Sequence, residues 1–214
     1  MNDHHNPRSL IPTIVCLLVL PTLGTAQEVE VASVDTSGSQ QNVAAAKPFI
    51  SGSGRFVVFE STGLDPADVT GNQIYLHDLV LGQTELISIN NSGVVADSAA
   101  NLPRNLGGRG VTDDGSKVIF SSDATNLPDT DDNLAGTTHV YVRDRTAGTT
   151  IRLSQTSGGI AGNGTSGTNF EFAIASDGWG ALFNSNATNL DPLDVDTTNI
   201  SYLHRFSDSS TNLA

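Results

Sequence analysis

The chain has 214 residues, and its 23 Asp and Glu against 10 Lys and Arg give a formal net charge of −13 at pH 7. This charge disfavours binding to nucleic acid or to anionic lipid, because both are bound through Lys and Arg. The one cysteine, Cys16, lies close to the N-terminus.

The first 26 residues have the order of a secretory signal peptide. Arg8 supplies positive charge, residues 11–23 are mainly apolar, and Gly24-Thr25-Ala26 places small residues before Gln27. The apolar run is shorter than the ~20 residues of a membrane-spanning helix, and no other run is long enough to span. We therefore expect export to the periplasm or the outside, and an exported chain stabilised without disulfides.

Residues 27–42 resemble the end of a repeat that occurs further along the chain. "EVEVASVDTSGSQQN" is similar to "TELISINNSGVVADSAAN" and to "TIRLSQTSGGIAGNGTS", each a predicted strand followed by a Ser- and Gly-rich connector. The sequence thus predicts a lone outer strand near residues 28–33 and a connector after it.

The rest of the chain contains three copies of one pattern, predicted to span residues 43–88, 89–154 and 155–214. Turn glycines recur at steps of 61 and 63 residues, each followed five positions later by Phe. A tyrosine follows in each copy, and nine residues after it a threonine. These positions are Gly54, Gly115 and Gly178; Phe59, Phe120 and Phe183; Tyr75, Tyr141 and Tyr202; and Thr84, Thr150 and Thr211.

Each copy is predicted to form four strands joined by tight turns. "KPFI", "RFVVFE", "QIYLHD" and "TELIS" in the first copy are short runs rich in β-branched and aromatic residues, and turn residues separate them. No amphipathic helix is predicted after residue 26. Three four-stranded antiparallel repeats of about 60 residues predict an all-β protein built from β-propeller blades.

The second copy, "VTDDGSKVIFSSDATNL" followed by "THVYVRDRTAGTTIRLS", resembles the TolB-like, WD-repeat-like propeller repeats of exported bacterial proteins. The first copy shortens "DATNL" to "TGL", and the third has Arg205 where the others have Asp78 and Asp144. Three blades are fewer than the ~4–8 of a closed propeller. The sequence therefore predicts an incomplete ring or a fragment, completed by further blades of a longer chain or by a second copy.

An acidic loop follows the conserved leucine position of each copy, Leu64, Leu127 and Leu190. Alternating carboxylates with a nearby Asn suit Ca²⁺, although the full calcium-loop pattern is absent and solvated turn caps explain the same residues. The candidate ligands are Asp191, Asp194, Asp196, Asn199, Asp129 and Asp131.

Other residues gave weaker signals. His77 and His204 share a repeat position and His139 begins the equivalent strand; we expect all three to be partly exposed strand residues rather than metal ligands. Trp179 is the one tryptophan, and we expect it to pack between blades. No residue set marks a catalytic centre, and Ca²⁺ is the one cofactor considered.

Two functions are compatible with this sequence. The first is an exported, non-catalytic propeller that binds a protein, a peptide or a glycan. The second is the propeller portion of a larger hydrolase or peptidase, which gates or binds its substrate. A propeller fold alone selects neither function.

Overall fold

A computed structural model of the chain describes residues 29–65, 71–104, 109–128, 136–167, 169, 171–193, 198–207 and 210–213. The predicted signal peptide lies outside these residues. The chain divides into two compact units, Met1–Glu30 and Val31–Ala214, and every strand belongs to the second.

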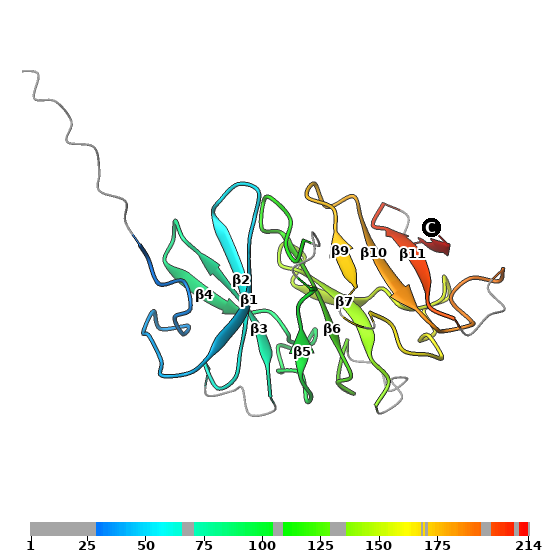
Figure 1. The fold of residues 1–214 in the computed structure, drawn as a ribbon, viewed down its shortest axis with the longest axis horizontal. Helices are drawn as coiled ribbons and strands as arrows, with labels where there is room; N and C mark the ends of the chain where they lie inside the picture. The colour runs from blue at the N-terminus through cyan, green and yellow to red at the C-terminus, as the bar shows by residue number, and fades with distance from the viewer. Residues whose placement is uncertain are drawn as a thin grey trace, which may run out of the picture. The chain divides into compact units, whose positions relative to one another are not determined.

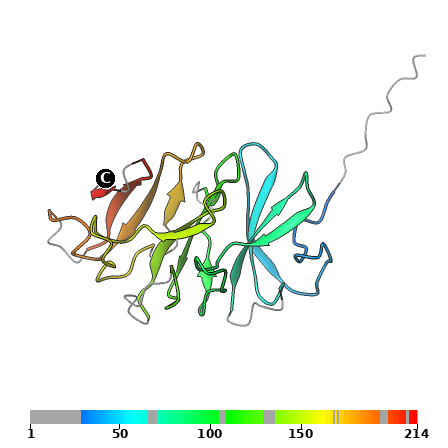
Figure 2. The same ribbon diagram turned by 180° about the vertical axis from the view of Figure 1, so that it is seen from behind.

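The second unit consists of three four-stranded antiparallel sheets, one following another along the chain (Figures 1 and 2). Sheet 1 comprises β1 (Ala45–Ile50), β2 (Phe56–Ser61), β3 (Gln73–Asp78) and β4 (Gln83–Leu86). Sheet 2 comprises β5 (Ala100–Asn101), β6 (Lys117–Ser122), β7 (His139–Asp144) and β8 (Thr149–Arg152). Sheet 3 comprises β9 (Phe172–Ile174), β10 (Gly180–Ser185), β11 (Ile200–Arg205) and β12 (Ser210–Leu213). The prediction of an all-β chain is confirmed for the described residues, which contain no α-helix.

The recurring Phe and Tyr of each repeat are directly opposed on neighbouring strands. Phe120 pairs with Tyr141 in the register of β6 and β7, and their ring centroids are 5.6 Å apart. Equivalent stacked pairs lie in the other two sheets at 5.8 and 5.6 Å. Aromatic cross-strand pairs stabilise sheets, so the period of the sequence reflects the same pair built three times.

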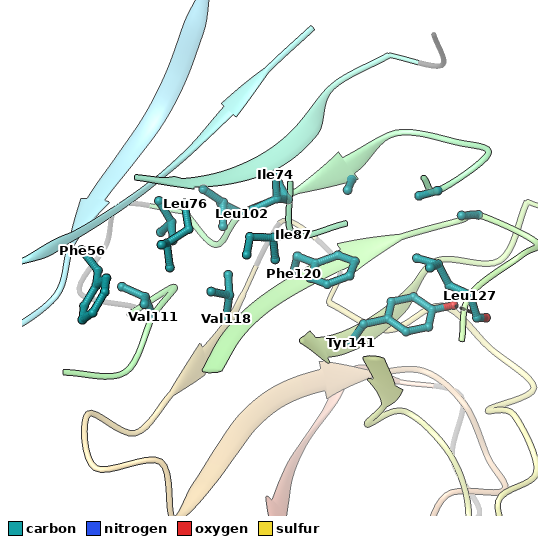
Figure 3. Close-up of a cluster of buried hydrophobic side chains, with 14 residues drawn as sticks. Phe56, Ile74, Leu76, Ile87, Leu102, Val111, Val118, Phe120, Leu127 and Tyr141 are labelled. Atoms are coloured by element: carbon teal, nitrogen blue, oxygen red, sulfur yellow. Dashed lines mark hydrogen bonds between the residues drawn. The ribbon is translucent and has the colours of Figure 1, made fainter. Parts of the chain in front are cut away.

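The sheets are held together by apolar side chains that fill the space between them. One buried cluster joins sheets 1 and 2, and Figure 3 shows Phe56 beside Val111 at one end of it and Tyr141 beside Leu127 at the other. A second cluster joins sheets 2 and 3 through residues such as Val140, Val142 and Phe183. Sheets 1 and 3 thus each bury one face against sheet 2, and sheet 2 buries both of its faces.

The first strand of sheet 2 differs from the prediction. In the second copy "RGV" (residues 109–111) stands before the Asp-Gly turn as "KPFI" stands before the turn of the first, which predicts the strand there. Val111 makes only an isolated bridge to Val118, while Ala100 and Asn101 pair with the far end of β6. Sheet 1 has a bulge at the corresponding place, between Ala46 and Phe49. The segment "LPRNLGGRG" in sheet 2 contains a proline and three glycines, which disfavour a continuous strand.

Residues 29–33 lie outside the strands of the described residues, and the lone outer strand expected near the N-terminus stays a prediction. A lone strand needs a neighbouring edge for its N–H and C=O groups. The connector after it does form: Val34 bridges Gln40, as Ile89 bridges Val95 in the next connector.

In the part of the chain that the structure describes, no helix has both the length and the apolar character needed to cross a bilayer.

Candidate functional site

The repeated "ATN" corner of a sheet binds the connector that leads into that sheet from the preceding one. Asn126 Nδ2 donates to the Val95 carbonyl at 2.8 Å, and its Oδ1 accepts the Asp97 N–H at 3.1 Å. Thr125 donates its N–H and hydroxyl to the two Asp97 carboxylate oxygens. Thr188 and Asn189 form the same arrangement with Asn163 and Ala161. The duplicated motif is therefore a clamp on the connector between successive sheets, and these contacts account for its recurrence.

The predicted calcium ligands fall mostly outside the described residues. Asp129, Asp131, Asp194 and Asp196 lie outside them, whereas Asp191 and Asn199 lie inside. Asp191 Oδ1 accepts the Leu193 N–H at 2.8 Å, which is a turn-capping contact. No group of three or more His, Cys, Asp or Glu is gathered among the described residues. The calcium site stays a prediction, which thermal unfolding with added calcium and with a chelator tests.

The three histidines are buried, which contradicts the expectation of partial exposure. His77, His139 and His204 are 1–2% exposed. His77 Nδ1 lies 2.9 Å from Thr84 Oγ1, and His204 Nδ1 lies 2.8 Å from Thr211 Oγ1. These hydrogen bonds explain why His and Thr recur together, since a buried ring nitrogen requires a partner. The histidines lie in separate sheets.

The space between sheets 1 and 2 is closed at both ends by side chains of β2. At the end that carries the β1–β2 and β3–β4 turns, the Phe56 ring lies against Gly115 so closely that a Cβ there would be 2.4 Å from it. Arg145 stacks 5.6 Å from the Phe56 centroid and pairs with Glu85 at 2.7 Å. At the opposite end, Glu60 is 2% exposed.

Glu60 spans from sheet 1 to sheet 2. Its carboxylate accepts the Leu102 N–H at 2.6 Å and pairs with Lys47 at 2.9 Å. A buried carboxylate needs such a set of donors, because desolvation otherwise disfavours its charge.

The space between sheets 2 and 3 is open at the turn-bearing end, because Lys117 stands where β2 has Phe56. A cleft of about 490 Å³ remains there, which we call the turn-end cleft. Its lining residues are Lys117, Val142, Asp144, Thr149, Ile151, Gly178, Trp179, Phe206 and Ser207. Trp179 is 51% exposed, so the expectation that it packs fully between blades is wrong.

Backbone contacts hold Trp179 at this cleft. Its N–H donates to Asp177 Oδ1 at 3.3 Å, and its carbonyl accepts the Phe206 N–H at 3.1 Å. Phe206 lies on the opposite turn of sheet 3, so the two aromatic residues are fixed together. The cleft thus combines an exposed indole with apolar walls and a few polar groups, the usual composition of a binding pocket.

An ion pair lies inside the turn-end cleft. Lys117 Nζ is 3.0 Å from Asp144 Oδ2, and 5.9 Å from the Phe206 ring centroid. Burial raises the pKa of Asp144, but the Ala147 N–H and Lys117 outweigh burial and hold that pKa below its ordinary value. Asp144 is therefore ionised at neutral pH, and the Lys117 ammonium has further N–H donors for a ligand.

A second opening, the loop-end cleft, lies between the same two sheets at the opposite end. Ser121 stands where β2 has Glu60, and a cleft of about 370 Å³ remains. Its lining is Ala99, Asn101, Ser121, Ser122, Asp123, Thr138, Thr165, Gly167 and Asn169. Ser121 is fully buried, and its hydroxyl has no hydrogen-bond partner among the described residues.

Sequence reasoning missed both clefts, although the signal was present. It aligned the repeats for what they share, whereas the clefts arise where they differ, at Phe56 against Lys117 and at Glu60 against Ser121. At both positions, the side chain of β2 reaches across to sheet 2, whereas the equivalent side chain of β6 leaves a cleft between sheets 2 and 3.

The chain matches no protein-family model, and no curated protein matches it. Among the solved structures that are similar to it are two with low sequence identity. A structure from a study of two prolyl endopeptidases has 13% identity and a TM-score of 0.44, covering 84% of this chain and 23% of that one. The tricorn protease has 14% identity and a TM-score of 0.42, covering 78% of this chain and 14% of that one. The chain thus spans less than a quarter of the length of either protein.

Proposed function

We propose that residues 43–214 are three blades of an exported TolB-like β-propeller and act as a non-catalytic binding module. The turn-end cleft takes an apolar or aromatic side chain of a protein or peptide partner. The half-exposed Trp179 is the observation that carries this proposal, because an indole beside a cleft offers a large contact area that a partner desolvates.

The chemistry of the cleft supports a peptide over other ligands. Val142, Ile151 and Phe206 give apolar walls for a side chain. Lys117 adds donors for a peptide carbonyl, and Asp144 adds an acceptor for a peptide N–H. The apolar walls thus suit a side chain of the partner peptide, and the ion pair suits the peptide backbone next to that side chain.

The one tryptophan of the chain reports binding directly. Titration with the capped tripeptides Gly-Phe-Gly and Gly-Leu-Gly is expected to shift Trp179 emission to the blue and to saturate, whereas Gly-Ser-Gly leaves it unchanged. Lys117→Phe restores the side chain that closes the space between sheets 1 and 2, and should abolish the shift. Lys117→Arg keeps the charge and should preserve it.

A blue shift of Trp179 emission of equal size in the Lys117→Phe variant would contradict the assignment of the turn-end cleft as the binding site. A response to maltohexaose and to none of the tripeptides would reassign the module to glycans.

The alternative is a propeller portion of a larger hydrolase or peptidase. It would use the same cleft to hold a substrate, and a coding sequence that continues past Ala214 into a hydrolase domain would support it.

A further inference from the structure

The two outer faces of the three-sheet stack leave exposed some of the apolar positions that the inner interfaces bury, although Phe59 and Tyr75 on the outer face of sheet 1 are themselves buried. We call the face of a sheet toward the preceding sheet its leading face, and the opposite one its trailing face. Equivalent positions on the leading faces are Ile50, Val111 and Ile174, paired in each sheet with Val57, Val118 and Ala181.

On the leading faces of sheets 2 and 3 these positions are buried. Val111 and Ile174 are each 2% exposed, because the trailing face of the preceding sheet covers them. In sheet 1, Ile50 is 61% exposed and Val57 is half-buried. The same apolar position is therefore covered twice and open once.

The trailing faces show the converse. Val58 of sheet 1 and Ile119 of sheet 2 are fully buried. Their equivalent in sheet 3, Leu182, is 48% exposed, and its cross-strand partner Leu203 is half-buried. Nothing among the described residues covers this face as sheets 2 and 3 cover the two before it.

We propose that the trailing face of sheet 3 binds the leading face of sheet 1 of a second copy of this chain. The contact continues the two interfaces that the chain already makes between its own sheets, with the same apolar positions opposed. Each copy carries both halves of it, so two copies satisfy all four outer faces. The product is a closed ring of two chains and six sheets, within the ~4–8 units that close a propeller.

Such a contact is heterologous, since it joins two different faces, and this gives a sharp test. The chain, expressed from its full sequence and purified, is expected to have twice the monomer mass by light scattering at micromolar concentration. Leu182→Glu disrupts only the trailing face of sheet 3, and Ile50→Glu disrupts only the leading face of sheet 1. Each variant is expected to be monomeric, with association weakened about 100-fold by a charge facing an apolar surface.

Mixing the two variants separates this contact from a symmetric one. The intact leading face of Leu182→Glu meets the intact trailing face of Ile50→Glu, so the mixture is expected to form a one-to-one dimer. The control Leu193→Glu changes an exposed leucine away from both faces and should leave the mass unchanged.

A monomeric unaltered chain would overturn the proposal, and so would variants that stay monomeric when mixed. Oligomers that lengthen with concentration would overturn the closed ring. Because these measurements use mass alone, they are independent of whether the turn-end cleft binds a peptide.

Discussion

Single side chains decide which inter-sheet spaces are closed. Glu60 and Ser121 occupy one repeat position, yet the first spans two sheets through Leu102 and the second leaves a cleft. Asp78 is a comparable case within one sheet, where two bonds from Arg55, at 2.9 and 2.7 Å, hold the β3–β4 turn against β2.

Replacing Glu60 should reveal its spanning role. Glu60→Ala leaves the buried Leu102 N–H without its acceptor, and we expect it to lower the free energy of unfolding by about 2 kcal/mol in urea denaturation. Glu60→Gln keeps an acceptor and should cost less. Glu30→Ala, in the segment before the first sheet, is the control, and an equal loss there would refute the assignment.

Asp78 predicts a specific acid sensitivity. Hydrogen bonding from Arg55, helped by the Leu81 and Val80 N–H groups, outweighs burial and lowers the pKa of Asp78 to about 2. In the unfolded chain the group titrates near ~3.9. Its contribution to stability is thus complete above about pH 4 and is lost as the pH falls toward 2.

The expected result is a fall in the free energy of unfolding between pH 4 and 2 that is shallower in Asp78→Asn. Urea denaturation at a series of pH values measures both slopes, and equal slopes would show that Asp78 does not contribute.

The elements are connected by directional clamps. The "ATN" corner of a sheet binds the connector that leads into that sheet. The Thr150 and Thr211 hydroxyls donate to the carbonyls of Ile89 and Leu153, which follow the last strand of the preceding sheet. Sheet 1 has "TGL" in place of the full corner.

Asn126→Ala should test one clamp. The substitution removes an acceptor from the Asp97 N–H and a donor from the Val95 carbonyl, and we expect a loss of about 1–2 kcal/mol by urea denaturation. Ser92→Ala, an exposed position in the same connector, should change stability little. If the two variants lose the same amount, the clamp does not stabilise the interface.

The sequence predicted what each repeat shares and missed what depends on its neighbours. The pairing of Phe120 with Tyr141 follows from the local strand pattern, so the sequence was sufficient to predict it. The lone strand predicted near residues 28–33 depends on a partner edge, which no residue of that segment specifies. The clefts depend on Lys117 and Ser121 facing a different sheet, so they required the sheets to be placed side by side.

At the scale of the whole molecule, stability comes from stacked sheets with no disulfide after residue 26. Three equivalent glycines show how closely neighbouring sheets pack. Gly54, Gly115 and Gly178 have φ values of 73°, 70° and 72°, so alanine introduces the same backbone strain at each. Their surroundings differ: a Cβ meets nothing within 4 Å at Gly54, Thr112 at 3.4 Å at Gly178, and the Phe56 ring at 2.4 Å at Gly115.

We therefore expect Gly54→Ala and Gly178→Ala to lose about 1 kcal/mol each, and Gly115→Ala to lose a further ~1–3 kcal/mol from overpacking. Thermal and urea denaturation of the three variants measure the series. Equal losses would mean that the sheets do not press together at Phe56.

The clamps have a consequence for how such a chain lengthens. The corner of each repeat holds the connector that joins its sheet to the sheet before, and its last strand leads into the connector of the next sheet. A gene segment of about 60 codons that is duplicated in frame would encode an extra sheet whose two faces already match those of its neighbours. Growth by tandem duplication then requires no new kind of contact between sheets. Later substitutions at positions equivalent to 56 and 60 can open a cleft between two sheets.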